Sequence, residues 1–69
     1  MEIKVNGELV NLPEGKNALA DVFAEIGIAL EQAGIAVAVN MELVPRSEWA
    51  AVVLQSGDRV EIITARQGG

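Results

Sequence analysis

The dipeptide Asn6-Gly7 fixes the first element of the fold, because a tight hairpin turn needs two residues that accept positive φ. Short segments that alternate apolar and polar residues flank it on both sides. Closing the turn there predicts three cross-strand pairs on one face: Val5 with Glu8, Ile3 with Val10, and Met1 with Leu12. Five of these six residues are apolar, so this face is the predicted core side. Four residues then share the opposite face: Glu2, Lys4, Leu9 and Asn11.

One helix is predicted over residues 19–26. Its apolar residues fall at i, i+3, i+4 and i+7, the spacing of one amphipathic stripe: Leu19, Val22, Phe23 and Ile26. Asn17 is the predicted N-cap, and Gly27 is placed to end the helix in a left-handed conformation. Asp21 and Glu25 lie on the opposite side, where a solvated helix face is favoured over acid–base chemistry.

The rest of the chain adds two strands, a short hairpin partner and a short helix. Residues 35–39 alternate Ile or Val with Ala and predict a strand that is central in the sheet. Residues 42–44 pair briefly with it after an Asn40-Met41 turn, and residues 46–54 predict a short helix after Pro45, with Trp49 as a core plug. Residues 59–64 form the last strand. The order predicts an α+β, two-layer domain over residues 1–64, followed by a flexible tail over residues 65–69.

Composition narrows the function classes. A chain of 69 residues has little interior for a deep substrate pocket, and it contains no His, Cys or Tyr. Gly15-Lys16-Asn17 lacks the upstream glycine and the Ser or Thr of a phosphate-binding loop. A net charge of −5 disfavours nucleic acid and anionic membranes as partners. We therefore expect a cytoplasmic protein that is not an enzyme, binds no metal or cofactor, and has neither an export signal nor a membrane span.

Two apolar residues are predicted to lie on the sheet face that the helix leaves uncovered. The register places Leu9 and Ile63 there, with Ala36 or Ala38 beside them. A contiguous apolar patch on an open sheet face is a candidate docking surface. The alternative is partial coverage of this face by the chain itself.

The terminal Gly68-Gly69 leads to the most specific hypothesis about chemistry. Glycine has no Cβ, so a tail ending in this pair can thread a narrow channel and place the α-carboxylate against a nucleotide in another protein. The five residues after Thr64 reach about 17 Å when extended. A carboxylate presented in this way can be activated as an acyl-adenylate and then attacked by sulfur or by an amine. The alternative is a frayed chain end without function.

With these features the sequence resembles the ThiS family, the sulfur-carrier proteins of thiamine biosynthesis within the MoaD/ThiS superfamily. The resemblance extends over nearly the whole chain and rests on five stretches: Asn6-Gly7, Val37-Ala38-Val39-Asn40, Val44-Pro45-Arg46 with Trp49, Gly57-Asp58 before Val60-Glu61-Ile62, and Gly68-Gly69. It implies a ubiquitin-like β-grasp fold with a mixed sheet of four to five strands, one main helix and one short helix. It also implies that Gly69 carries sulfur as a thiocarboxylate, with Gly68 giving the tail its access.

The resemblance further implies a set of partners. An adenylating enzyme of the ThiF type would use ATP and Mg²⁺, a sulfurtransferase or cysteine desulfurase system would deliver sulfur, and a thiazole synthase of the ThiG type would accept it. Leu9, Ile63 and Arg66 are the expected docking residues, although Arg66-Gln67 is more polar than the apolar approach typical of the family. Three alternatives remain open: the small subunit of molybdopterin synthase, a protein modifier that forms isopeptide bonds, and a β-grasp binding module without tail chemistry.

Overall fold

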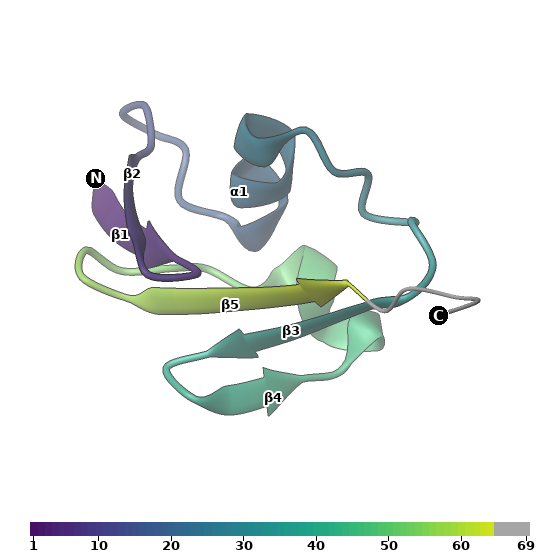
Figure 1. Cartoon of the computed structure of the whole chain (residues 1–69). Helices are drawn as coiled ribbons and strands as arrows, with labels where there is room; N and C mark the ends of the chain where they lie inside the picture. Colours follow the sequence, from purple (N-terminus) through teal and green to yellow (C-terminus); the bar gives the residue numbers. More distant parts are fainter. Residues whose placement is uncertain (65–69) are drawn as a thin grey trace.

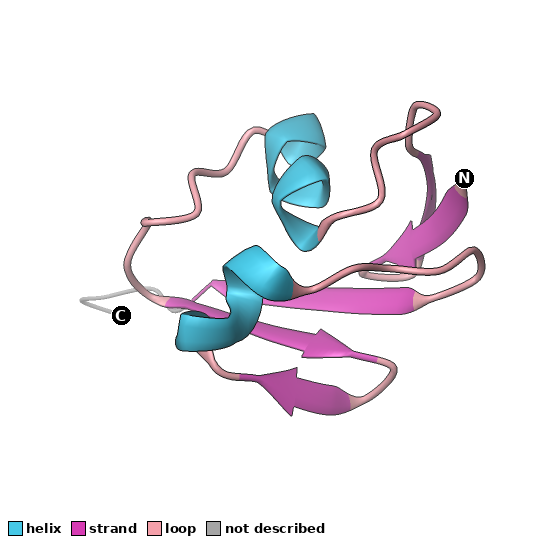
Figure 2. Cartoon of the chain, turned by 180° about the vertical axis from the view of Figure 1, so that it is seen from behind, coloured by secondary structure: helices cyan, strands magenta, loops and turns pink. Residues whose placement is uncertain are grey.

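The five strands form one sheet, and both helices lie on the same side of it. The structure is a computed structural model and describes residues 1–64. The elements in chain order are β1 (Glu2–Val5), β2 (Glu8–Asn11), α1 (Leu19–Ile26), β3 (Ile35–Val39), β4 (Glu42–Val44), the 3₁₀ helix η1 (Arg46–Ala51) and β5 (Arg59–Thr64). In Figure 1, α1 lies above the sheet, and Figure 2 shows η1 in front of β3 and β5. The predicted α+β, two-layer arrangement is confirmed.

The predicted hairpin at the start of the chain is confirmed in its register. Ile3 pairs with Val10 and Val5 with Glu8, while the backbones of Met1 and Leu12 exchange hydrogen bonds of 2.8 and 2.9 Å. Asn6 and Gly7 adopt φ values of 51° and 85°, the left-handed region that a tight turn of this kind requires.

The strand order is β2-β1-β5-β3-β4, so the last strand of the chain occupies the middle of the sheet. β1 and β5 are parallel, and the other pairs are antiparallel. The sequence analysis assigned the central position to residues 35–39, and this was wrong. β3 is an interior strand between β5 and β4, which explains why it is apolar, but alternation alone does not distinguish an interior strand from the middle one.

The core fills the space between the sheet and the two helices. Its buried residues come from every layer: Ile3, Val5, Leu12, Leu19, Val22, Phe23, Val37, Trp49, Leu54, Val60 and Ile62. The rings of Phe23 and Trp49 lie 5.4 Å apart at a tilted angle, so the aromatic residues of α1 and η1 pack directly on each other. The prediction that Trp49 belongs to the core is therefore confirmed.

Two helix ends differ from the sequence prediction. The N-cap of α1 is Ala18 instead of Asn17, and the Asp21 carboxylate accepts a 3.0 Å hydrogen bond from the Ala18 N–H. The Asn17 carbonyl instead accepts from the Leu54 N–H, because residues 52–54 run extended beside the start of α1. For the same reason the second helix ends at Ala51, not at Leu54. Gly27 ends α1 with a φ of 80°, as predicted, and Ile26 at the end of the stripe is 37% exposed.

Candidate functional site

The candidate site has two parts, which are the strand that leads into the predicted tail and the sheet face opposite the helices. Gly69, Gly68 and Arg66, the residues predicted for adenylation, access and docking, lie outside the described residues 1–64. The structure describes the strand from which they follow. β5 ends at Thr64, which pairs with Ile35 on β3.

On the other side of β5, the side chain of Asn6 continues the sheet beyond the end of β1. The Asn6 carboxamide accepts a 2.8 Å hydrogen bond from the Ile62 N–H and donates a 3.2 Å bond to the Ile62 carbonyl. The backbone of β1 turns away at this point into the hairpin, so its next pair of hydrogen bonds to β5 would otherwise be missing. The Asn6 amide takes the place of backbone and holds the last part of β5 against β1.

Asn40 makes a similar set of hydrogen bonds at the start of β5. Its backbone N–H donates to the Arg59 carbonyl at 2.7 Å, and its side-chain oxygen accepts from the Arg59 N–H at 3.0 Å. Its side-chain nitrogen donates to the Asp58 carboxylate at 3.1 Å. Asparagines that stand in hairpin turns thus fix β5 at two points, Arg59 and Ile62.

The outer face of the sheet carries exposed apolar side chains. Leu9 is 65% exposed and Ile63 is 64% exposed, as the predicted register requires. Ile63 pairs with Ala36 on β3, and Ala38 pairs with Leu43 on β4, so these four residues form a patch over β5, β3 and β4 that we call the outer patch.

Leu9 does not join the outer patch. It pairs with Lys4, which in turn pairs with Arg59, and Arg59 lies four residues before Ile63 on β5. That separation is about 13 Å along the strand, with Glu61 on the same face in between. The two predicted docking residues therefore share a face, but a row of charged side chains separates them.

Leu43 is the member of the outer patch that the sequence analysis missed. It is 73% exposed and lies directly beside Ala38. A turn at Asn40-Met41 already implies that residue 43 pairs with residue 38, so the register carried this information.

Arg46, in the stretch of sequence that carries the resemblance most specifically, has a structural role. Its guanidinium donates to the carbonyls of Leu30 and Gln32 at 2.9 and 2.6 Å and lies 4.4 Å above the Trp49 ring. The Trp49 indole N–H donates to the Val44 carbonyl at 2.9 Å. Together these contacts fix the long connection after α1 and the connection after β4.

Within residues 1–64 there is no cluster of three or more metal-ligating side chains. None of the helices in this part of the chain is long and apolar enough to span a membrane.

Comparison with known proteins decides the family. The model of the ThiS family matches residues 3–69. The chain belongs to the ThiS family. This match includes the hairpin, the segment from Val37 to Trp49 and Gly68-Gly69, which are the features on which the resemblance was based.

Two curated relatives share parts of their length with this ThiS-family chain. The sulfur carrier protein ThiS of Escherichia coli is 42% identical over 38 residues, which are 55% of this chain and 58% of that protein. A thiazole synthase of Paramagnetospirillum magneticum is 33% identical over 69 residues, which are 100% of this chain and 20% of that protein. The chain therefore spans less than two thirds of the length of either relative.

Two solved structures of thiamine biosynthesis proteins confirm the ubiquitin-like β-grasp fold. The crystal structure of the thiamine biosynthesis protein ThiS from Geobacter metallireducens superposes with a TM-score of 0.76 at 24% identity and covers 100% of both chains. The solution structure of a thiamine biosynthesis protein from the same organism gives 0.75 at 25% identity over 100% of this chain and 88% of the other.

Proposed function

We propose that this chain is a cytoplasmic sulfur carrier that donates sulfur for thiazole formation in thiamine biosynthesis. The observation that carries the proposal is the ThiS-family match over residues 3–69, because it extends through the terminal Gly68-Gly69. The chain itself supplies a folded domain and a C-terminal carboxylate. The bond-making chemistry belongs to other proteins, in keeping with a chain that contains no His and no Cys.

The proposed reaction sequence takes place at Gly69. Its carboxylate attacks the α-phosphorus of ATP in an adenylating enzyme that uses Mg²⁺, and pyrophosphate leaves. A terminal persulfide sulfur of a sulfurtransferase or cysteine desulfurase system then attacks the acyl carbon and displaces AMP, which gives an acyl disulfide. A thiol of that system cleaves the acyl disulfide, so that the thiocarboxylate is released and the two protein sulfurs are left as a disulfide. A thiazole synthase accepts this sulfur. That acceptor is supported by the alignment of the whole chain with part of a protein named thiazole synthase.

The tail chemistry is tested by deleting Gly69 and, separately, by Gly68→Val. Deletion leaves the carboxylate about 3.5 Å short, and a Cβ at position 68 restricts φ and obstructs a narrow channel. We expect adenylation by the partner enzyme to fall about 100-fold or more in both variants, because misplacement of about 1 Å can have that effect. Thermal melting should stay at the wild-type value. Full adenylation of both variants would contradict the carrier function and leave a binding module.

The proposed thiocarboxylate at Gly69 is tested by measuring the mass of the intact protein isolated from its own host. A thiocarboxylate replaces one oxygen of Gly69 by sulfur, and treatment with an alkylating reagent should modify the sulfur-bearing form alone. An isopeptide-linked form would identify a protein modifier instead.

We further propose that the outer face docks the adenylating enzyme, with Leu9 and Ile63 in the contact and Arg66 on the approach of the tail. Burying an introduced carboxylate is unfavourable, so Ile63→Asp should weaken binding to that enzyme about tenfold or more. Leu9→Asp should act in the same direction. Both affinities are measured by calorimetry after melting has shown that the fold is retained.

Val53→Asp is the matched control for both substitutions. Val53 is 65% exposed, like Leu9, but it lies next to the start of α1 on the helical side of the molecule. Equal loss of affinity in all three variants would place the contact elsewhere.

A further inference from the structure

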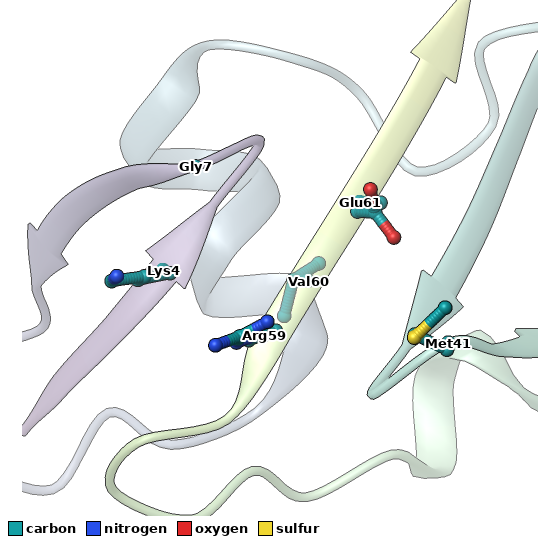
Figure 3. A pocket seen from close by; sticks show the side chains of 6 residues that line it. All are labelled: Lys4, Gly7, Met41, Arg59, Val60 and Glu61. Atoms are coloured by element: carbon teal, nitrogen blue, oxygen red, sulfur yellow. The ribbon is translucent and has the colours of Figure 1, made fainter.

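A hollow of about 340 Å³ lies on the outer face between the β1–β2 turn and the β3–β4 turn. Figure 3 shows the residues that line it: Lys4, Gly7, Met41, Arg59, Val60 and Glu61. Lys4 and Arg59 project from the neighbouring strands β1 and β5, and Met41 lies at the opposite side on the turn before β4. The hollow therefore combines a cationic wall with an apolar one.

The two cations face each other in the sheet without an anionic partner between them. Lys4 and Arg59 are register partners on adjacent strands, an arrangement in which like charges repel and destabilise the sheet. Among residues 1–64, the side-chain hydrogen bonds involve neither the Lys4 ammonium nor the Arg59 guanidinium. Arg46 differs, because two carbonyls and the Trp49 ring occupy its guanidinium.

Met41 is the second unusual feature of the hollow. Its side chain is 86% exposed, and its φ is 69°, a backbone conformation that a long side chain rarely adopts. The backbone thus presents a flexible, polarizable apolar side chain to solvent at a strained position. Neither the packing of the core nor the turn requires a methionine there.

We propose that this hollow recognises a segment of a partner protein in which a carboxylate stands next to an apolar side chain. The carboxylate binds between Lys4 and Arg59, whose guanidinium offers paired donors to carboxylate oxygens, and the apolar side chain packs on Met41. The chain has a net charge of −5, so this pair is a local positive spot on an acidic molecule. That charge pattern attracts a single carboxylate.

Polyanions fit the hollow poorly. Glu61 lines the same hollow and repels a dianion such as phosphate, and the overall negative charge opposes nucleic acid. A small free carboxylate would gain only the screened attraction of two exposed cations. A peptide carboxylate gains the apolar contact in addition, and this favours a protein partner.

The inference concerns the outer face and not the tail, so it does not depend on adenylation or sulfur transfer. Its test uses no adenylating enzyme, and its failure would leave the proposed chemistry at Gly69 untouched. Success would show which chemistry this hollow recognises.

The test begins with short random peptides displayed on phage and selected on the whole chain. We expect enrichment of Asp or Glu beside an apolar residue. Selected peptides, made synthetically, should bind Lys4→Gln and Arg59→Gln about tenfold more weakly than wild type, and wild-type binding should weaken as NaCl is raised. Lys16→Gln is the control, because it makes the same change in net charge outside the sheet.

Met41→Asn tests the apolar half of the site separately. Asparagine accepts positive φ more readily than methionine, so the melting temperature should stay the same or rise while peptide affinity falls. A merely structural methionine would instead show lower stability on replacement.

Three results would overturn the inference. One is a selected consensus without an acidic residue, and another is wild-type affinity in both Lys4→Gln and Arg59→Gln. The third is that acetate or inorganic phosphate alone shifts the Lys4 and Arg59 amide resonances with the affinity of the peptides. That result would identify a site for free anions.

Discussion

Asn6 and Asn40 occupy the same position in two hairpin turns and direct their side-chain amides to different residues of β5. Their φ values are 51° and 50°, so the backbone requirement is the same at both positions. Asparagine meets that requirement better than most residues, and its carboxamide imitates a peptide group. What differs is the part of β5 that each contacts, which is Ile62 for Asn6 and Arg59 for Asn40.

Asn6→Gly is predicted to loosen the end of β5 without straining the turn. Glycine tolerates the φ of 51° but lacks the amide, so both hydrogen bonds to Ile62 are lost. We expect the free energy of unfolding to fall by about 1–3 kcal/mol. Amide hydrogen exchange of Ile62 should become faster than in wild type, relative to the other β5 amides.

Asn40→Gly is the matched variant for this measurement. It should cause a similar loss of stability, but the amide with accelerated exchange should be that of Arg59. Equal effects on Ile62 in both variants would show that neither asparagine acts locally.

Among the elements, the short helix η1 contacts both α1 and the end of β4, although it has only six residues. Trp49 packs on Phe23 of α1, donates a hydrogen bond to the carbonyl of Val44 at the end of β4, and supports the guanidinium of Arg46. Arg46 in turn holds the connection between α1 and β3. One indole therefore links three parts of the chain.

Trp49→Phe is predicted to lower the free energy of unfolding by about 1–3 kcal/mol. The phenyl ring keeps part of the aromatic packing, but the Val44 carbonyl loses its donor and the smaller ring leaves space in the core. Chemical denaturation measures the loss. Val53→Ala, at a side chain that is 65% exposed, should change stability by less than about 0.5 kcal/mol. A wild-type midpoint for Trp49→Phe would show that the indole N–H contributes nothing.

On the scale of the whole molecule, the sequence predicted which residues form helices and strands better than it predicted the order of the strands in the sheet. Asn6-Gly7 and the alternation on both sides sufficed for the first hairpin, because turn chemistry and side-chain period are local properties. The central place of β5 was not predictable in this way, since its pairing with β1 joins residues more than fifty positions apart. Asn17 failed as an N-cap because a distant segment, residues 52–54, bonds to its backbone.

In the candidate site, too, the local features were predicted from the sequence and the arrangement of the strands was not. The exposure of Leu9 and Ile63 followed from strand alternation, and both were placed on the correct face. Their separation by Lys4, Arg59 and Glu61 depends on the order of the strands, which alternation does not contain. The hollow was not foreseen for the same reason, because its two walls come from β1 and β5 on one side and a distant turn on the other.

The central position of β5 also determines when the chain can fold during synthesis. The ribosome makes β5 after every other strand, and until it emerges the β1–β2 and β3–β4 hairpins have nothing between them. Isolated two-stranded hairpins are marginally stable in water. A nascent chain therefore gains its sheet only when its final strand has been translated. Any partner that recognises the folded outer face thereby selects chains whose translation has reached the residues leading into the tail.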